Sequence, residues 1–288
     1  MLQISQWDGD GLWNFLAFLN SRDALINGSI YRGHSDAAWK LIPALYRRKS
    51  RMLVAGPLSE AYLVRENLSL DAFFNRASNL LDPNARSPVR DRIIAQHYGV
   101  PTQLLDWTRD VIVATYFATD WERNNADGAI YQVNVSNLFV NYSAITFPIE
   151  YTIAALQPPT LDERVRMQKS VFTIQSFGTE ESFVPLDDRI KPRDSGVASR
   201  ERYKGEVESF NKIIIPYKKK LRLREDLLSI GVDSSLLFPG LQGIGLRIAE
   251  EESNATESIL RYEAEGGAAA HSLWVSDGTG ESILLKGD

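Results

Sequence analysis

The chain has 288 residues, 44% of them hydrophobic and 24% charged, with a formal net charge of -5 and no cysteine. These numbers describe an ordinary globular protein that can bury a substantial core, and they exclude disulfides, thiol nucleophiles and thiolate metal sites. The acidic balance argues against general nucleic-acid or membrane binding, and the absence of a secretory signal or of an apolar run of about 20 residues predicts a soluble cytoplasmic protein.

Helical patterns dominate the first half of the chain. Residues 1–8 are expected to form a short strand, and residues 29–31 are typical of a strand that runs into Arg32-Gly33-His34. Helices are expected from Gly9, over 58–81 and over 90–98, because apolar residues recur there at helical spacing. The expected apolar faces of the first two helices are Leu12, Trp13, Phe15, Leu16 and Leu19, and then Tyr62, Leu63, Leu68, Leu70, Phe73, Phe74 and Leu80.

The most informative stretch runs from Ala95 to Ala118. Gly99 suits a left-handed position just past a helix, and Pro101 prevents that helix from continuing. Residues 102–105 are too few and too apolar for a surface loop, so they are expected to be buried or half-buried. Polar side chains in so apolar a context need partners, which are either one another or a ligand.

A second helix is expected to follow this extended run and to reach Asn124. Asp106 or Thr108 is expected to cap it, because both side chains can accept a hydrogen bond from a backbone N–H in the first turn. Asp110 and Asp120 are expected on its solvated face.

Strand patterns dominate the second half. Strands are expected at 129–135, 170–175, 211–217 and 272–275, a short helix or structured loop at 161–168, and helices at 218–230 and 246–252. Residues 178–209 are charged and show little periodicity, which indicates a long polar excursion. Helices in the first half and strands in the second predict an α+β fold.

Arg32 is the first residue singled out for chemistry. It ends an apolar strand beside a glycine, where a guanidinium suits a bidentate grip on phosphate or carboxylate. The alternative is a structural arginine that pairs with a carboxylate such as Asp36 or Asp106. The histidines His34, His97 and His271 lack metal-ligand spacing, so no metal is expected. Serine-hydrolase elbows, P-loops and dinucleotide-binding glycine motifs are absent from the sequence.

These residues together resemble the FRG domain family, named for a Phe/Tyr-Arg-Gly signature. The signature here is Tyr31-Arg32-Gly33, followed by His34, Trp39, Leu41, Pro43 and Tyr46, and the strongest block is the run from Ala95 to Thr108 continued by Ala114, Tyr116, Phe117 and Ala118. Residues 166–172 and 237–243 resemble later family blocks. The resemblance implies a domain over 25–248 with the polar insertion at 178–209, an appendage at 1–24 and an extension at 249–288.

The order of these motifs is also similar to ADP-ribosyltransferases of the Arg-Ser-Glu type. That resemblance implies helices packed on a mostly antiparallel or mixed split sheet, with NAD as the substrate. It implies that Arg32 holds the NAD phosphates or ribose, that Trp107 or Thr108 supports the nicotinamide half, and that Gln168 stands where the family has a glutamate. A neutral amide can bind a ribose hydroxyl but cannot supply negative charge to an oxocarbenium-like transition state. Either Asp106 or Glu163 supplies the carboxylate, or the fold binds a nucleotide without transferase chemistry.

The predicted site residues therefore fall into two sets, one catalytic and one for binding. Its catalytic residues are Arg32, Asp106 and Gln168, and its binding residues are Tyr31, Gly33, His34, Gln96, His97, Gln103, Trp107, Thr108 and Tyr116. The first functional hypothesis is an NAD-consuming ADP-ribosyltransferase or NAD glycohydrolase, compatible with a toxin or phage-defence effector. The second is a non-catalytic nucleotide-sensing or protein-interaction module, and the third is a purely structural polar network. Convergence of the three catalytic residues on one open cleft favours the first, whereas an Arg32–Asp106 pair in a closed core opposes it.

Overall fold

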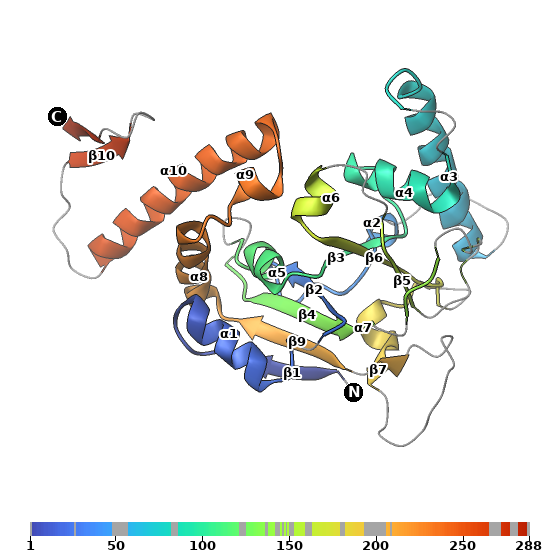
Figure 1. Cartoon of the computed structure of the whole chain (residues 1–288), viewed down its shortest axis with the longest axis horizontal. Helices are drawn as coiled ribbons and strands as arrows, with labels where there is room; N and C mark the ends of the chain where they lie inside the picture. Colours follow the sequence, from blue (N-terminus) through green and yellow to red (C-terminus); the bar gives the residue numbers. More distant parts are fainter. Residues whose placement is uncertain are drawn as a thin grey trace.

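The computed structural model describes residues 2–25, 27–47, 57–81, 86–120, 125–135, 138–141, 145, 147, 149, 153–158, 163–178, 182–192, 206–207, 209–264, 272–276 and 282–286. Its centre is a seven-stranded sheet in the order β1-β9-β4-β2-β3-β6-β5 (Figure 1). The strands are β1 (Gln3–Gln6), β2 (Ser29–His34), β3 (Leu105–Thr108), β4 (Gly128–Asn134), β5 (Ala154–Leu156), β6 (Ser170–Ile174) and β9 (Phe210–Ile215). Only the edge pair β1–β9 is parallel, and the other neighbours within this sheet are antiparallel.

Helices occur along the whole described chain, and two pairs of short strands lie outside the main sheet. The helices are α1 (Gly11–Ser21), α2 (Ala44–Arg47), α3 (Leu58–Arg76), α4 (Pro88–His97), α5 (Val111–Ala118), α6 (Glu163–Met167), α7 (Leu186–Arg189), α8 (Tyr217–Ser229), α9 (Ser234–Leu237) and α10 (Leu241–Ala264). The paired short strands are β7 (Lys191–Pro192) with β8 (Glu206–Val207), and β10 (Ser272–Ser276) with β11 (Ser282–Lys286). The α+β class is confirmed. The segregation of helices and strands into two halves was wrong, because strand and helix patterns alternate through the chain.

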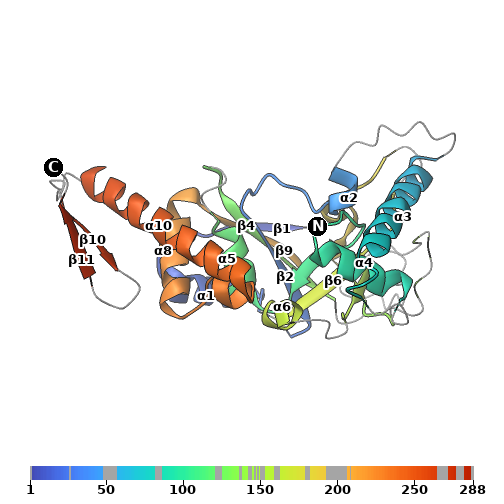
Figure 2. The same ribbon diagram turned by 90° about the horizontal axis from the view of Figure 1, so that it is seen from above.

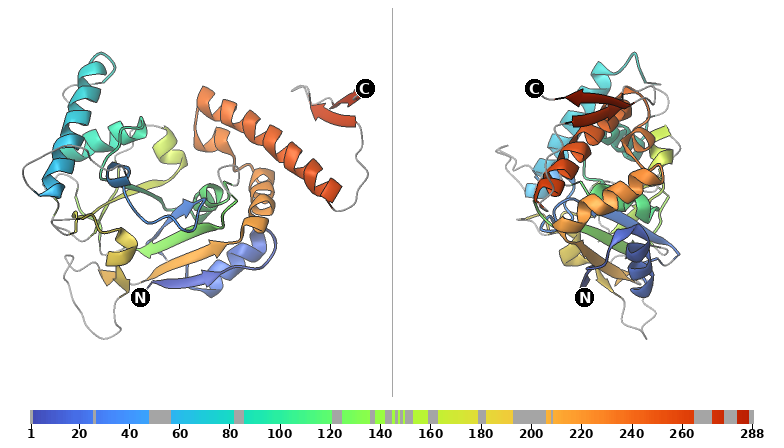
Figure 3. Two further views of the ribbon diagram at one scale, coloured as in Figure 1. Left: turned by 180° about the vertical axis from the view of Figure 1, so that it is seen from behind. Right: turned by 90° about the vertical axis from the view of Figure 1, so that its left-hand side faces the viewer.

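The main sheet buries both of its faces. One face packs against α1, α5 and α8, in a core that includes Phe15, Ile130 and Leu223. The opposite face packs against the segment after β2 and against α7, around Leu41 and Leu186. The views in Figure 3 show α1 and α8 side by side at one end of the sheet, in agreement with their direct contact. Seen from above in Figure 2, α3 and α4 lie toward one end of the molecule and α10 toward the other.

The sheet opens between β2 and β3. These strands share a single registered pair, Tyr31 with Thr108, whereas β2 and β4 are in register over six pairs and β3 and β6 over four. Past Tyr31 and Thr108 the two strands diverge, so backbone groups there need partners other than the ladder. The mostly antiparallel, mixed sheet is as predicted, and this divergence creates space beside Arg32.

The turn between α4 and β3 has the predicted form. Gly99 has φ +85°, and the N–H of Val100 returns to the carbonyl of Ala95, which ends α4. Residues 102–105 are buried as expected. The predicted cap of the next helix was wrong: Asp110 Oδ1 accepts from Ile112 N at 2.8 Å, because residues 106–108 are already committed to β3.

Three further predictions need correction. Asp110 does not lie on a solvated helix face, since it caps α5 and pairs with Lys169 at 2.6 Å. The expected end of α5 at Asn124 falls outside the described residues, and the helix itself ends at Ala118. Trp13 and Leu80 are 78% and 84% exposed, because the face of α1 that carries Trp13 points away from the sheet and Leu80 lies beyond the end of α3.

The polar excursion at 178–209 contributes in part to the core. Leu186, Ile190 and Val207 are buried in it, whereas residues 193–205 lie outside the described residues. Among the helices that the structure describes, none has both the length and the apolar character needed to cross a bilayer.

Candidate functional site

A cleft of about 270 Å³ lies where the sheet opens. Strands β2, β3 and β6 contribute residues to it, together with α4, α5 and α6, so it is built where several elements meet. Its lining residues are Tyr31, Arg32, Gly33, Ile93, Gln96, His97, Asp106, Trp107, Thr108, Val113, Phe117, Arg164, Val165, Gln168, Ser170 and Phe172.

Arg32 bridges the gap between the diverging strands. Its Nη1 donates to the backbone carbonyl of Asp106 at 2.6 Å, in place of a ladder bond, and its Nε donates to His34 Nε2 at 2.9 Å. The Nη1 atom is also 3.7 Å from Asp106 Oδ2. Burial lowers the pKa of Arg32 to about 10, so the guanidinium stays charged at neutral pH.

Asp106 presents its carboxylate at the mouth of the cleft. The side chain is 60% exposed, although Gln96 Nε2 donates to its Oδ1 at 2.6 Å. Gln96 is itself oriented, because the Thr102 hydroxyl donates to its Oε1. The carboxylate is therefore held by α4 and β2 while it remains accessible to a ligand.

Gln168 lies just past the end of α6 on another wall. Its Nε2 donates to the carbonyl of Leu237 at 2.9 Å, which ties this wall to the end of α9. Arg164, which precedes Gln168 by four residues, stacks over the ring of Phe238 at 4.6 Å. Arg32, Asp106 and Gln168 thus converge on one open cleft, and the Arg32–Asp106 pair lies at its mouth and not in a closed core.

Comparison with family models identifies a segment in the first half of the chain. Residues 27–127 match the FRG domain. This protein contains an FRG domain. The matched segment runs from the turn before β2 to the turn before β4, and it supplies Arg32 and Asp106 to the cleft. Searches of curated proteins and of solved structures found no match. The wider extent over 25–248 stays a prediction.

Most of the predicted binding residues line the cleft. They are Tyr31, Gly33, Gln96, His97, Trp107 and Thr108. The polar ends of two of them already have partners: the Tyr31 hydroxyl donates to the Ala24 carbonyl, and Trp107 Nε1 donates to Thr173 Oγ1. These two aromatic residues therefore shape the cleft chiefly as part of the fold.

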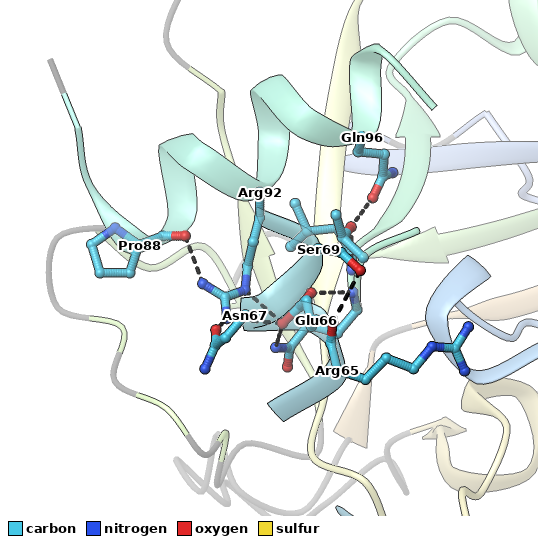
Figure 4. Close-up of polar contacts among 10 residues, drawn as sticks. Arg65, Glu66, Asn67, Ser69, Pro88, Arg92 and Gln96 are labelled. Atoms are coloured by element: carbon cyan, nitrogen blue, oxygen red, sulfur yellow. Dashed lines mark hydrogen bonds and ion pairs between the residues drawn. The ribbon is translucent and has the colours of Figure 1, made fainter. Parts of the chain in front are cut away.

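Gln103 and Tyr116 are absent from the residues that line the cleft. The backbone N–H and the Nε2 of Gln103 both donate to the buried carboxylate of Glu66, at 2.8 and 2.6 Å. Glu66 also pairs with Arg92, and Figure 4 shows these two side chains meeting between α3 and α4. The Tyr116 hydroxyl bonds to Glu250 of α10, and Arg224 stacks on its ring at 3.8 Å. Both residues join elements distant in sequence, which motif spacing cannot reveal.

The apolar and cationic part of the cleft was missed in the list of predicted site residues. Ile93, Val113, Phe117 and Phe172 form apolar surface, and Arg164 adds a second guanidinium. One signal for Arg164 was available, because its four-residue spacing from Gln168 puts both on one side of a helical turn. Among the described residues, no group of three or more acidic or histidine side chains is placed to hold a metal ion, and His271 lies outside them.

His34 lies behind Arg32 and lines a neighbouring cavity instead of the cleft. It is buried, and its Nε2 accepts from Arg32, so the neutral ring carries its proton on Nδ1. Burial and the adjacent charge of Arg32 lower the pKa of His34 to about 2. The histidine therefore serves as a neutral acceptor that orients the guanidinium.

Because His34 is buried in its neutral form, we expect the free energy of unfolding to depend on pH. Below the unfolded-state pKa of about 6.5, the unfolded chain binds a proton that the folded state excludes, so stability falls as pH falls. His34→Gln keeps an acceptor for Arg32 and removes the titration. Between pH 7.5 and 5.5, urea unfolding should show wild type losing about 1.4 kcal/mol more than His34→Gln, which is about a tenfold change in the unfolding equilibrium constant over the whole interval. Equal losses in the two proteins would contradict a neutral buried His34.

Proposed function

We propose that the cleft of the FRG domain binds NAD and supports cleavage of the bond between nicotinamide and ribose, as an ADP-ribosyltransferase or NAD glycohydrolase. The observation that carries this proposal is the position of Asp106. It places a carboxylate in the cleft together with Arg32 and Gln168, and so offers the negative charge that Gln168 cannot supply. Glu163, the other carboxylate considered, is not among the residues that line the cleft; it pairs instead with Arg166 at 3.3 Å.

Arg32 suits the phosphates of the substrate. Its contact with Asp106 Oδ2 is long, at 3.7 Å, whereas its bonds to the Asp106 carbonyl and to His34 fix the plane of the guanidinium. A phosphate can therefore replace the long contact without reorienting the side chain. A guanidinium that is already oriented loses less conformational freedom on binding.

The proposed chemistry is a heterolytic cleavage. The bond between the ribose C1′ and the nicotinamide nitrogen breaks, and its electron pair leaves with nicotinamide. The Asp106 carboxylate stabilises the positive charge that develops on the ribose, and the amide oxygen of Gln168 accepts a hydrogen bond from a ribose hydroxyl. Water or an acceptor nucleophile then bonds to C1′ and loses its proton.

A second candidate function is nucleotide binding without cleavage. Gln168 favours it, because a neutral amide tied to the Leu237 carbonyl at 2.9 Å supplies hydrogen bonds but no charge. In that case the same cleft acts as a nucleotide sensor, and its ligand changes how the domain meets a partner. The two functions differ in a single measurable step, which is the release of nicotinamide.

The test is incubation of the full chain with NAD, with nicotinamide measured by chromatography. We expect release by wild type and a loss of about 10²–10³-fold in rate for Arg32→Ala and for Asp106→Asn, the size seen when one electrostatic stabiliser is removed. Glu163→Gln and Arg166→Ala are matched controls, because both remove exposed charges, and they should leave the rate within about twofold.

Calorimetry with NAD separates the two candidate functions. Binding that Arg32→Ala weakens, without any release by wild type, supports the nucleotide sensor and rejects the enzyme. If NAD neither binds nor releases nicotinamide, both candidate functions are rejected, and the cleft is a structural feature. If cleavage occurs, growth arrest on expression in bacteria, absent with Asp106→Asn, would support the toxin or phage-defence role.

A further inference from the structure

A second cavity, of about 480 Å³, adjoins the cleft. The two share Arg32, Gly33 and Phe117, so they meet at the end of β2. The other residues that line the second cavity are His34, Ser35, Trp39, Lys40, Ile42, Arg47 and Asp120. A ligand with two halves joined by a short linker can therefore occupy both cavities, with its linker beside Arg32.

The shared end carries positive charge. Arg47 contributes a second guanidinium beside Arg32, and its Nε is anchored to the Ile42 carbonyl at 2.8 Å. Burial is the main cause of the lowered pKa of Arg32; the Asp106 carboxylate opposes this shift, and the charge of Arg47 adds to it. Like charges held together in this way are relieved by an anion, and a diphosphate is the anion that a dinucleotide places between its halves.

Trp39 supplies an aromatic surface in the same cavity. Its side chain is exposed although it is large and apolar: the residue is 44% exposed, with its ring edge-on to His34 at 6.0 Å. Its backbone carbonyl accepts from the Tyr131 hydroxyl at 3.1 Å, which fixes this part of the chain independently of the indole. An accessible indole next to cationic side chains is the combination on which nucleotide bases stack.

We infer that the second cavity binds the purine nucleoside half of the dinucleotide, with the base on Trp39 and the diphosphate between Arg32 and Arg47. The inference rests on the proposed function only in that the nicotinamide half occupies the cleft. The binding of a purine nucleotide in the second cavity does not require that any bond be cleaved. Its test therefore measures binding, and its outcome is separate from that of the cleavage test.

The test uses calorimetry of the full chain with two probes, ADP-ribose and nicotinamide mononucleotide. Trp39→Ala should weaken ADP-ribose binding about tenfold, the usual cost of losing one base-stacking partner, and leave nicotinamide mononucleotide binding within twofold. Trp39→Phe should restore most of the ADP-ribose affinity. Trp13→Ala removes another exposed tryptophan, on α1 outside the residues of both cavities, and should change neither affinity.

A second variant keeps the test decisive if Trp39→Ala fails to fold. Arg47→Ala should weaken ADP-ribose binding about fivefold, which is the cost expected for one lost phosphate contact. Arg222→Ala on α8 is the matched control and should leave the affinity unchanged. Wild-type ADP-ribose affinity in Trp39→Ala, or in Arg47→Ala where Trp39→Ala does not fold, would overturn the inference, and so would equal weakening of both probes by Trp39→Ala. Selective weakening of ADP-ribose would support it, even if NAD is never cleaved.

Discussion

Gly33→Ala is expected to destabilise the protein by more than about 3 kcal/mol, at the upper end of the cost of forcing one methyl group into a packed core. A Cβ atom at this position would lie 2.0 Å from the Ala114 carbonyl oxygen and 2.7 Å from the Ala118 nitrogen, both backbone atoms of α5. Neither atom can move unless the helix moves. The glycine of the Tyr-Arg-Gly signature is therefore required because α5 packs directly on β2.

Urea unfolding followed by circular dichroism measures this loss. Gly245→Ala is the matched control, since a Cβ at Gly245, within α10, would meet nothing within 4 Å. That variant should be as stable as wild type or gain up to about 1 kcal/mol, because alanine favours a helix. A Gly33→Ala protein within 1 kcal/mol of wild type would show that α5 does not lie as close to β2 as described.

Glu66→Ala is expected to cost about 3–5 kcal/mol, the usual loss when one partner of a buried ion pair is removed. Glu66 is fully buried, and its carboxylate accepts from Arg92 Nε at 2.9 Å and from the backbone and side chain of Gln103. Truncation leaves the Arg92 charge, itself 4% exposed, without its carboxylate. The loss is large because three donors, on Arg92 and on the backbone and side chain of Gln103, lose their acceptor.

The same unfolding measurement tests this pair. Glu163→Ala breaks an ion pair between two exposed side chains, so it should cost at most about 1 kcal/mol and serves as the control. Glu66→Gln preserves the shape and should lose less than Glu66→Ala. Losses of the same size for Glu66→Ala and Glu163→Ala would contradict the buried network.

This network also supports the cleft. Glu66 belongs to α3, Arg92 to α4, and Gln103 to the segment that leads into β3, so the three residues hold together the elements that carry Gln96 and Asp106. We therefore expect Glu66→Ala to weaken ligand binding through loss of order in this wall, and not through a direct contact.

The local elements around the site could be predicted from the amino-acid sequence. Gly99 and Pro101 predicted the end of α4, and the Tyr31-Arg32-Gly33 strand and the buried run at 102–105 were found where expected. These predictions hold because turn chemistry, strand pattern and helix termination depend on residues close in the chain. The FRG resemblance was confirmed over residues 27–127 for the same reason, since its motifs are local.

Which polar side chains face the cleft depends on contacts between residues far apart in the chain. Gln96 and Gln103 lie in one motif, yet Gln96 reaches Asp106 while Gln103 turns to Glu66, 37 residues away. Tyr116 likewise bonds to Glu250, 134 residues away. A buried polar group must find a partner wherever the fold supplies one, and in these two cases the partner lies on another helix. The opening between β2 and β3 is also a property of strand pairing, and it places the Tyr31-Arg32-Gly33 motif at the wall of a cleft.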